Sequence, residues 1–86
     1  MIEPRELVEI EWEDITTEVA GWDTTEAAIK RCSTSTCRSV GYLMFHDEEV
    51  VKIAMMTSLD EDMTGTWSAI PTGCIRKMKT LTDRVD

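Results

Sequence analysis

The 86-residue sequence contains few of the residues that mark secreted, membrane-spanning or catalytic proteins. It has three cysteines, one histidine and two prolines. Three cysteines are too few, and odd in number, for the disulfide framework of a small secreted domain, so we expect free thiols in a reducing compartment. No stretch approaches the ~20 apolar residues of a membrane span, and the first residues lack the pattern of a signal peptide. We therefore expect a cytoplasmic protein.

The length predicts one domain over residues 1–86, because chains divide into separate cores only well beyond ~200 residues. Hydrophobic residues make up 42% of the chain and charged residues 30%, which is ordinary globular usage. The chain therefore has enough apolar side chains to fold, around a single small core.

The formal net charge of −8 is concentrated near the N-terminus. Nine of the seventeen acidic residues fall within residues 1–26, where Arg5 is the only basic residue. A negative surface of this kind repels phosphate backbones, which disfavours general nucleic-acid binding through it. A basic partner, or a decoy role in which the acids imitate DNA, stays open.

Residues 7–14 give the clearest structural signal. Val8, Ile10 and Trp12 alternate with glutamates, which predicts a strand with one buried face and one charged face. A loop is expected over 15–22, followed by a helix from about Thr24 to Cys32, for which Asp23 has the spacing of an N-cap. Residues 33–36 are expected to be a polar linker.

The second half of the chain predicts further strands. Residues 37–45 and 50–57 suit a hairpin with an acidic turn at 46–49, and Gly41 suggests a bulge. A short strand is expected from Gly65 to Ile70, and a 3₁₀ turn into a final strand over 74–81. The predicted fold is mainly β, a small five-stranded barrel with one short helix between strands 1 and 2.

This order of elements resembles the SH3-like and Sm-like barrels. Short stretches of the sequence are also similar to a group of uncharacterised proteins from tailed phages and prophages. They are residues 8–14 (VEIEWED), 21–22 (GW), 39–43 (SVGYL) and 69–75 (AIPTGCI). The resemblance implies a small β-barrel, a viral source and a location in the host cytoplasm. The Sm-like comparison also implies ring assembly, but the RNA-contact motif of true Sm proteins is not recognisable.

Two sets of residues have the chemistry of metal ligands, although neither has the right spacing. Cys32, Cys37, His46 and Cys74 are the ligand types of zinc, but they are scattered. Residues 60–65 match the start of a calcium loop, in which position 12 should be glutamate and is Pro71. We predict no metal and no cofactor.

No motif of a catalytic site is recognisable. His46 is the only histidine, and nothing in the sequence frames a cysteine as a nucleophile. A Gly-rich phosphate loop is also absent from the sequence, and a core of this size leaves little room for a concave site. We therefore predict that the protein is not an enzyme.

Two surfaces are candidates for binding. Arg76, Lys77 and Lys79, with Lys30, Arg31 and Arg38, predict a basic patch away from the first strand, for which a solvated surface balanced by acids is the alternative. The candidate protein-binding residues are Trp22, Tyr42, Met44 and Trp67. Trp22 is either a lid on the barrel or an exposed anchor.

The apolar residues of the central hairpin predict self-association. Strict alternation puts Val40, Tyr42 and Met44 on one face of the strand 37–45, and Leu43 and Phe45 on the other. Apolar residues likewise fall on both faces of the strand 50–57, so one barrel interior does not absorb them all.

The predicted function follows from this excess of apolar surface. We expect an accessory or structural protein that acts through protein–protein contacts, chiefly as a homo-oligomer and in the Sm-like case as a ring. A different phage or host protein is an alternative partner. Sm-like RNA binding and the acidic decoy are the competing hypotheses, and no membrane is expected as a partner.

Overall fold

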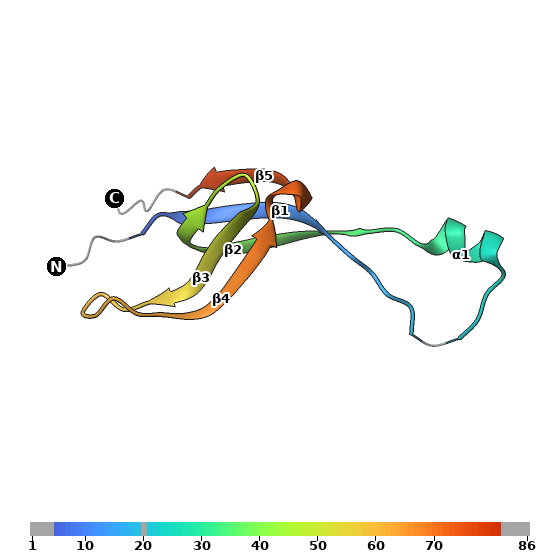
Figure 1. Ribbon diagram of the computed structural model, residues 1–86, viewed down its shortest axis with the longest axis horizontal. Helices are drawn as coiled ribbons and strands as arrows, with labels where there is room; N and C mark the ends of the chain where they lie inside the picture. The colour runs from blue at the N-terminus through green and yellow to red at the C-terminus, as the bar shows by residue number, and fades with distance from the viewer. Residues whose placement is uncertain (1–4, 20, 82–86) are drawn as a thin grey trace.

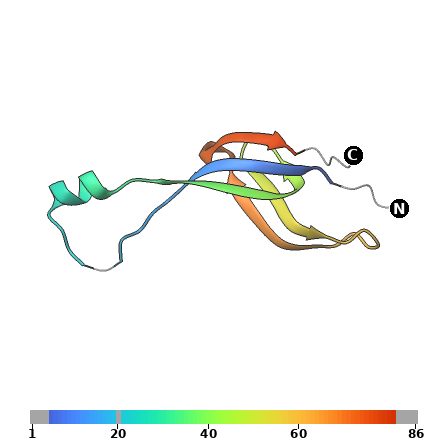
Figure 2. The same ribbon diagram turned by 180° about the vertical axis from the view of Figure 1, so that it is seen from behind.

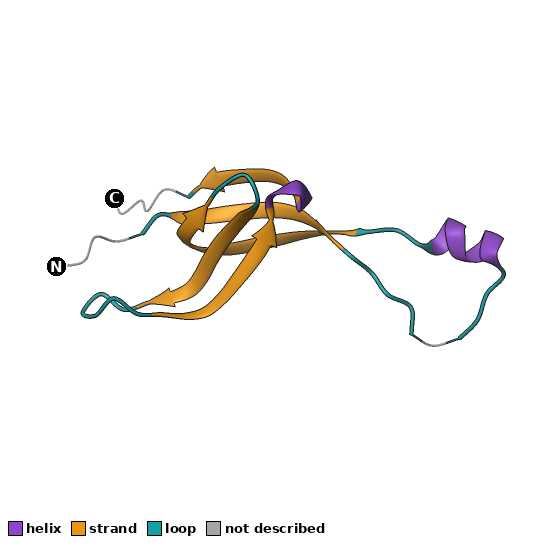
Figure 3. Cartoon of the chain, viewed as in Figure 1, coloured by secondary structure: helices purple, strands orange, loops and turns teal. Residues whose placement is uncertain are grey.

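The computed structural model describes residues 5–19 and 21–81. Five antiparallel strands form one open sheet in the order β4-β3-β2-β1-β5 (Figures 1 and 3). The strands are β1 (Leu7–Asp14), β2 (Ser35–His46), β3 (Val50–Thr57), β4 (Thr64–Pro71) and β5 (Ile75–Thr80). A 3₁₀ turn, η1 (Thr72–Cys74), precedes β5, and one helix, α1 (Thr25–Arg31), lies between β1 and β2. The predicted mainly β class, the five strands and the 3₁₀ turn are confirmed.

The core lies inside the curved sheet. Val8 and Ile10 of β1 are almost fully buried, and they pack with Val51, Ile53 and Ile70 from β3 and β4. Trp12 is partly buried against this cluster, and its indole N–H donates a hydrogen bond to the Ser39 hydroxyl at 3.0 Å. The alternation predicted for β1 is therefore correct, because its apolar side chains face inward and its glutamates face outward.

The two edges of the sheet, β4 and β5, are not paired with each other among the described residues. β1 pairs with β5 only as far as Trp12, whereas its pairing with β2 continues to Asp14 and Ser35. The ribbon of β1 and β2 therefore extends beyond the rest of the sheet.

The described residues between β1 and β2, 15–19 and 21–34, lie at the far end of this ribbon, and we call them the arm. Figures 1 and 2 show the arm and its helix α1 projecting away from β3, β4 and β5. The longest dimension of the molecule is 59 Å, against 27 and 25 Å for the others. The helix is thus no cover for the sheet.

Several local predictions need correction. The N-cap of α1 is Thr24, whose hydroxyl accepts a hydrogen bond from the Ala27 N–H at 3.2 Å, and not Asp23. β2 begins at Ser35 because residues 35 and 36 pair with β1, so the predicted linker 33–36 ends early.

The bulge predicted at Gly41 lies instead at Met44. The register shifts between Leu43, which pairs with Ile53, and Phe45, which pairs with Lys52. Neighbouring residues of β3 point to opposite faces, so Lys52 lies on the face of Ala54 and not on that of Ile53. Phe45, opposite Lys52, therefore lies on the same face as Tyr42. The prediction that places Leu43 and Phe45 on one face is wrong. Gly41 is needed for close packing, because a Cβ there would lie 3.0 Å from the Ala54 carbonyl oxygen.

Candidate interaction surfaces

The arm exposes every large apolar side chain that the structure describes in it. Trp22 is 100% exposed, and Val19, Ile15 and Ile29 are 87%, 80% and 71% exposed. Of the two alternatives for Trp22, the structure therefore gives the exposed one. The core cluster of the sheet contains none of these four side chains, so packing within the described part of the molecule does not account for them.

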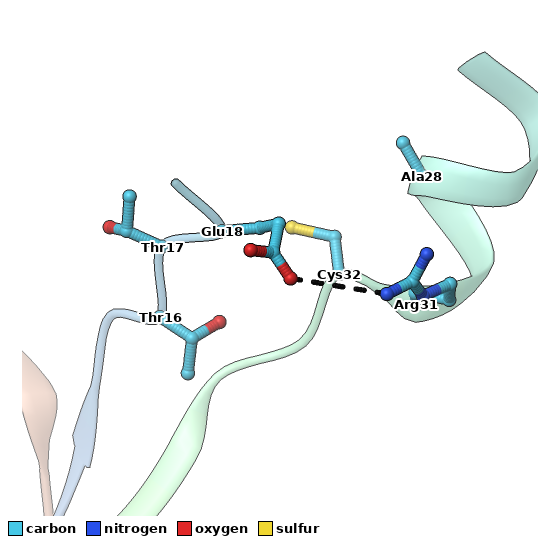
Figure 4. A pocket seen from close by; sticks show the side chains of 6 residues that line it. All are labelled: Thr16, Thr17, Glu18, Ala28, Arg31 and Cys32. Carbon is cyan, nitrogen blue, oxygen red and sulfur yellow. Dashed lines mark ion pairs between the residues drawn. The ribbon is translucent and has the colours of Figure 1, made fainter. Parts of the chain in front are cut away.

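The charged residues of the arm are paired with one another. Arg31 donates a hydrogen bond to the Asp23 carboxylate and lies 3.9 Å from the Glu18 carboxylate. Lys30 lies 3.7 Å from Glu26, one helical turn earlier. Figure 4 shows Arg31 reaching across from α1 to Glu18 on the opposite side of the arm. These contacts join the two sides of the arm.

A shallow pocket lies between the two sides of the arm at this point. Its lining consists of Thr16, Thr17, Glu18, Ala28, Arg31 and Cys32 (Figure 4). The Thr16 hydroxyl donates a hydrogen bond to the Ser33 carbonyl nearby. The pocket thus lies where a hydrogen bond and an ion pair join the two sides of the arm.

A second apolar surface lies on the outer face of β2, β3 and β4, which we call the Trp67 face. It follows from the register, in which Tyr42 pairs with Ala54 and Ala54 pairs with Trp67 in one row across three strands. Ala54 is fully buried although it lies outside the core cluster. The face consists of Tyr42, Phe45, Lys52, Ala54, Met56, Trp67 and Ala69.

The Trp67 face is exposed and contains a hollow beside Trp67. Trp67, Met56 and Phe45 are 69%, 56% and 47% exposed. The hollow is lined by Met44, Lys52, Thr64, Trp67, Ser68 and Ala69. The Lys52 ammonium lies 5.2 Å from the centre of the Phe45 ring. The structure thus brings Tyr42, Met44 and Trp67 together, and leaves Trp22 apart on the arm.

The predicted basic patch lies beside β1 and not away from it. β5 pairs with β1, so that Lys77 lies opposite Glu11 and Lys79 opposite Glu9. The Lys79 ammonium is 3.8 Å from the Glu9 carboxylate. Opposite charges alternate across the outer face of β1 and β5, which leaves no uniformly positive surface there.

Glu13 is the centre of a charged cluster at the base of the arm. Its carboxylate accepts hydrogen bonds from the hydroxyls of Thr36 and Thr34, at 2.7 and 2.8 Å, and from the Arg76 guanidinium at 2.6 Å. The hydroxyl of Thr36 and the guanidinium of Arg76, followed by Thr34, lower the pKa of Glu13 from 4.5 to about 2. The same pairing raises the pKa of Arg76. The cluster joins the arm to β1, β2 and β5.

The residues with metal-ligand chemistry are scattered over the structure. Cys32 lies on the arm, Cys37 in β2, and Cys74 in η1, and all three are free thiols. His46 is exposed at the end of β2. Within residues 5–19 and 21–81, no group of three or more histidine, cysteine or acidic residues is placed to hold a metal ion. In that same part of the chain, no helix has the length and apolar character needed to cross a membrane.

Sequence reasoning missed part of both surfaces. Ile15 and Val19 fall in the predicted loop and Ile29 falls in the predicted helix, so nothing in the sequence shows that all three are exposed on one projection. Phe45 joins the Trp67 face only because of the bulge at Met44, whereas Met56 lies there by alternation with Ala54 on β3. Comparisons of this chain with protein-family models, with curated proteins and with solved structures gave no match.

Proposed function

We propose that this protein is a small non-catalytic assembly protein that works through protein–protein contacts, chiefly with copies of itself. The observation that carries this proposal is the arm, which holds four large apolar side chains in solvent, away from the sheet. Soluble monomers rarely expose so many large apolar side chains on one projection, and tryptophan is enriched at binding hot spots. We also propose that the protein comes from a tailed phage or prophage, as the sequence resemblance implies.

The proposed fold is an SH3-like barrel of the Sm-like kind that opens on one side. Support comes from the strand order β4-β3-β2-β1-β5 and from the 3₁₀ turn before β5. The free edges of β4 and β5 are also suited to pairing with other copies, since an unpaired edge strand offers a row of backbone donors and acceptors. A ring is one closed assembly that such edges allow.

The competing nucleic-acid hypotheses have less support from the ion pairs. Arg76 and Lys79, two of the three cations that β5 contributes to the predicted patch, pair with Glu13 and Glu9. These ion pairs also partly neutralise the glutamates on the outer face of β1. Arg38 adds to this, since it lies 3.7 Å from both Glu9 and Glu11. Neither a free basic groove nor a free acidic row is left on this surface to bind RNA or to imitate DNA.

The mass of the protein in solution tests the proposal. Light scattering at micromolar concentration and moderate salt is expected to give a multiple of 9.8 kDa. A mass of 9.8 kDa that persists at high concentration would contradict self-assembly. Retention of RNA by the purified protein, with strong salt dependence, would favour the RNA-binding hypothesis instead.

A further inference from the structure

We propose that the arm of one copy binds the Trp67 face of a second copy. This inference rests on the self-assembly proposed above, and it adds which two surfaces meet. Its starting point is that one molecule exposes both an apolar projection and an apolar face with a hollow beside Trp67.

The arm does not cover the Trp67 face of its own molecule. β1 and β2 stay paired in continuous register from Leu7 and Tyr42 to Asp14 and Ser35, so the arm leaves the sheet on a paired ribbon. Figures 1 and 2 show this ribbon leading away from β3 and β4. Trp22 at 100% and Trp67 at 69% exposure are accordingly both in solvent. Their contact therefore requires a second molecule.

The arm is suited to bind an apolar surface, because its charged side chains are already paired within the arm. Its two cations, Lys30 and Arg31, already pair with acids of the arm itself. Ile15, Val19 and Trp22 can therefore be buried against a surface without charged groups. Charged groups on the partner would lose their hydration on binding, and this cost would oppose the association.

The Trp67 face complements the arm in charge. The arm has one more acidic residue than basic residues, and the one charged side chain that lines the hollow beside Trp67 is Lys52. Lys52 is exposed, and it lies between Phe45 and Ala69 on the face with its ammonium 5.2 Å from the centre of the Phe45 ring. The weakly negative arm thus meets a weakly positive, mainly apolar surface.

The area of contact favours a second copy over a foreign partner. The four side chains of the arm present roughly 500 Å² of apolar surface, from ~150–250 Å² for a tryptophan and ~100 Å² for each aliphatic side chain. A stable interface buries about 800 Å² on each partner. A single arm on a single face falls short of this value. When every copy both gives its arm and offers its face, each buries about 1,000 Å², and both exposed surfaces are covered at once.

The arm and the Trp67 face are different surfaces, so a substitution can remove one of them and leave the other intact. A variant with a defective arm can therefore still bind a variant with a defective face. Trp22→Asp removes the arm contact and keeps the face, whereas Trp67→Glu removes the face and keeps the arm. Each variant alone is expected to self-associate at least ~30-fold more weakly, the effect of losing a hot-spot residue. An equimolar mixture is expected to form a complex of one copy of each, through one intact arm and one intact face, and to bind more weakly than the wild type because only half of the contact area is left.

Matched variants control for folding and for surface charge. Leu59→Asp places an acid at another exposed apolar residue, 67% exposed, which belongs to neither surface, and is expected to leave association unchanged. Met56→Glu provides a second change of the Trp67 face in case Trp67→Glu does not fold. Circular dichroism verifies that each variant keeps its sheet before the mass of single and mixed proteins is measured by analytical ultracentrifugation.

The outcomes separate this inference from the broader proposal. If the wild-type protein is a monomer at all concentrations, self-assembly and the arm contact both fail. If the wild type and both single variants associate equally well, self-assembly stands and the arm contact is wrong. If Trp67→Glu associates normally and only Trp22→Asp fails, the arms bind one another and the Trp67 face is not their receptor. Recovery of a complex only on mixing supports the arm bound to the face.

Discussion

Trp12 shows how one side chain joins the core to the neighbouring strand β2. It packs against the core cluster from β1, and its indole N–H is bonded to Ser39 of β2. We expect Trp12→Ala to lower the free energy of unfolding by about 3 kcal/mol, near the lower end for a tryptophan because the side chain is only partly buried. This is a large part of the ~5–15 kcal/mol that stabilises a typical domain.

Glu11→Gln is the control for this change, since Glu11 precedes Trp12 and points to the other face. Its ion pair with Arg38, at 3.7 Å, is exposed on the surface, and such pairs contribute less than about 1 kcal/mol. Urea denaturation of both variants measures the difference. Equal stabilities would mean that the register of β1 is wrong.

Gly41 is required for the close approach of β2 to β3. A Cβ at this position would lie 3.0 Å from the Ala54 carbonyl oxygen and 3.1 Å from the Ile53 side chain. We expect Gly41→Ala to destabilise the protein by about 1–3 kcal/mol, because backbone atoms have to move. Gly73→Ala is the matched control, since a Cβ there has nothing within 4 Å, and we expect a change within about 0.5 kcal/mol. Equal thermal midpoints for the two variants would contradict this packing.

At the scale of elements, the sequence predicted the strands well and their relation to the helix poorly. The alternation of β1 depends on residues next to one another, and it gave the correct buried face. The bulge at Met44 depends on how β2 pairs with β3, and no local pattern encodes that register. For the same reason, Phe45 was assigned to the wrong face.

The sequence did not predict that the arm projects into solvent, because the apolar residues of its helix resemble those of a helix that packs on a sheet. Ala27, Ala28 and Ile29 suggest such a helix, and only the continuous pairing of β1 with β2 shows that α1 lies far from the core. The residue type alone makes Trp22 a candidate for binding, because tryptophan is enriched at binding hot spots. No sequence pattern indicates that Val19 is also exposed on the arm.

Glu13 links three elements, and its pKa makes this link depend on pH. The pKa in the folded protein is about 2, below the ordinary 4.5, because the carboxylate accepts hydrogen bonds from Thr36, Arg76 and Thr34. A lowered pKa means that the charged carboxylate stabilises the fold above 4.5 and that this stabilisation is lost as the pH falls toward 2. Glu13→Gln is therefore expected to lower the Tm at neutral pH, by an amount that shrinks as the pH falls through this window.

Thermal denaturation of both proteins across this pH range measures the difference in Tm. Glu48→Gln, in the turn between β2 and β3, corrects for the removal of one negative charge from an acidic protein. A difference in Tm that stays constant down to pH 2 would mean that the hydrogen bonds to Glu13 do not stabilise its charged form.

At the scale of the whole molecule, net charge and apolar surface have opposite effects on assembly. Two copies with a net charge of −8 repel each other, and the repulsion extends over a Debye length of ~30 Å at 0.01 M salt but only ~8 Å at 0.15 M. The contact between the arm and the Trp67 face is mainly apolar, and salt does not screen the burial of apolar surface. The two contributions therefore respond differently to ionic strength.

We accordingly expect self-association to strengthen as salt rises from ~10 mM to ~150 mM, because screening removes the repulsion and leaves the apolar contact intact. Light scattering over a dilution series at both salt concentrations measures the change in association constant. Binding of RNA to a basic surface would show the reverse, since phosphate contacts weaken steeply with salt. Self-association that weakens over this range would place ion pairs at the interface. The arm, whose cations are already paired with its own acids, would then not be the surface that joins the copies.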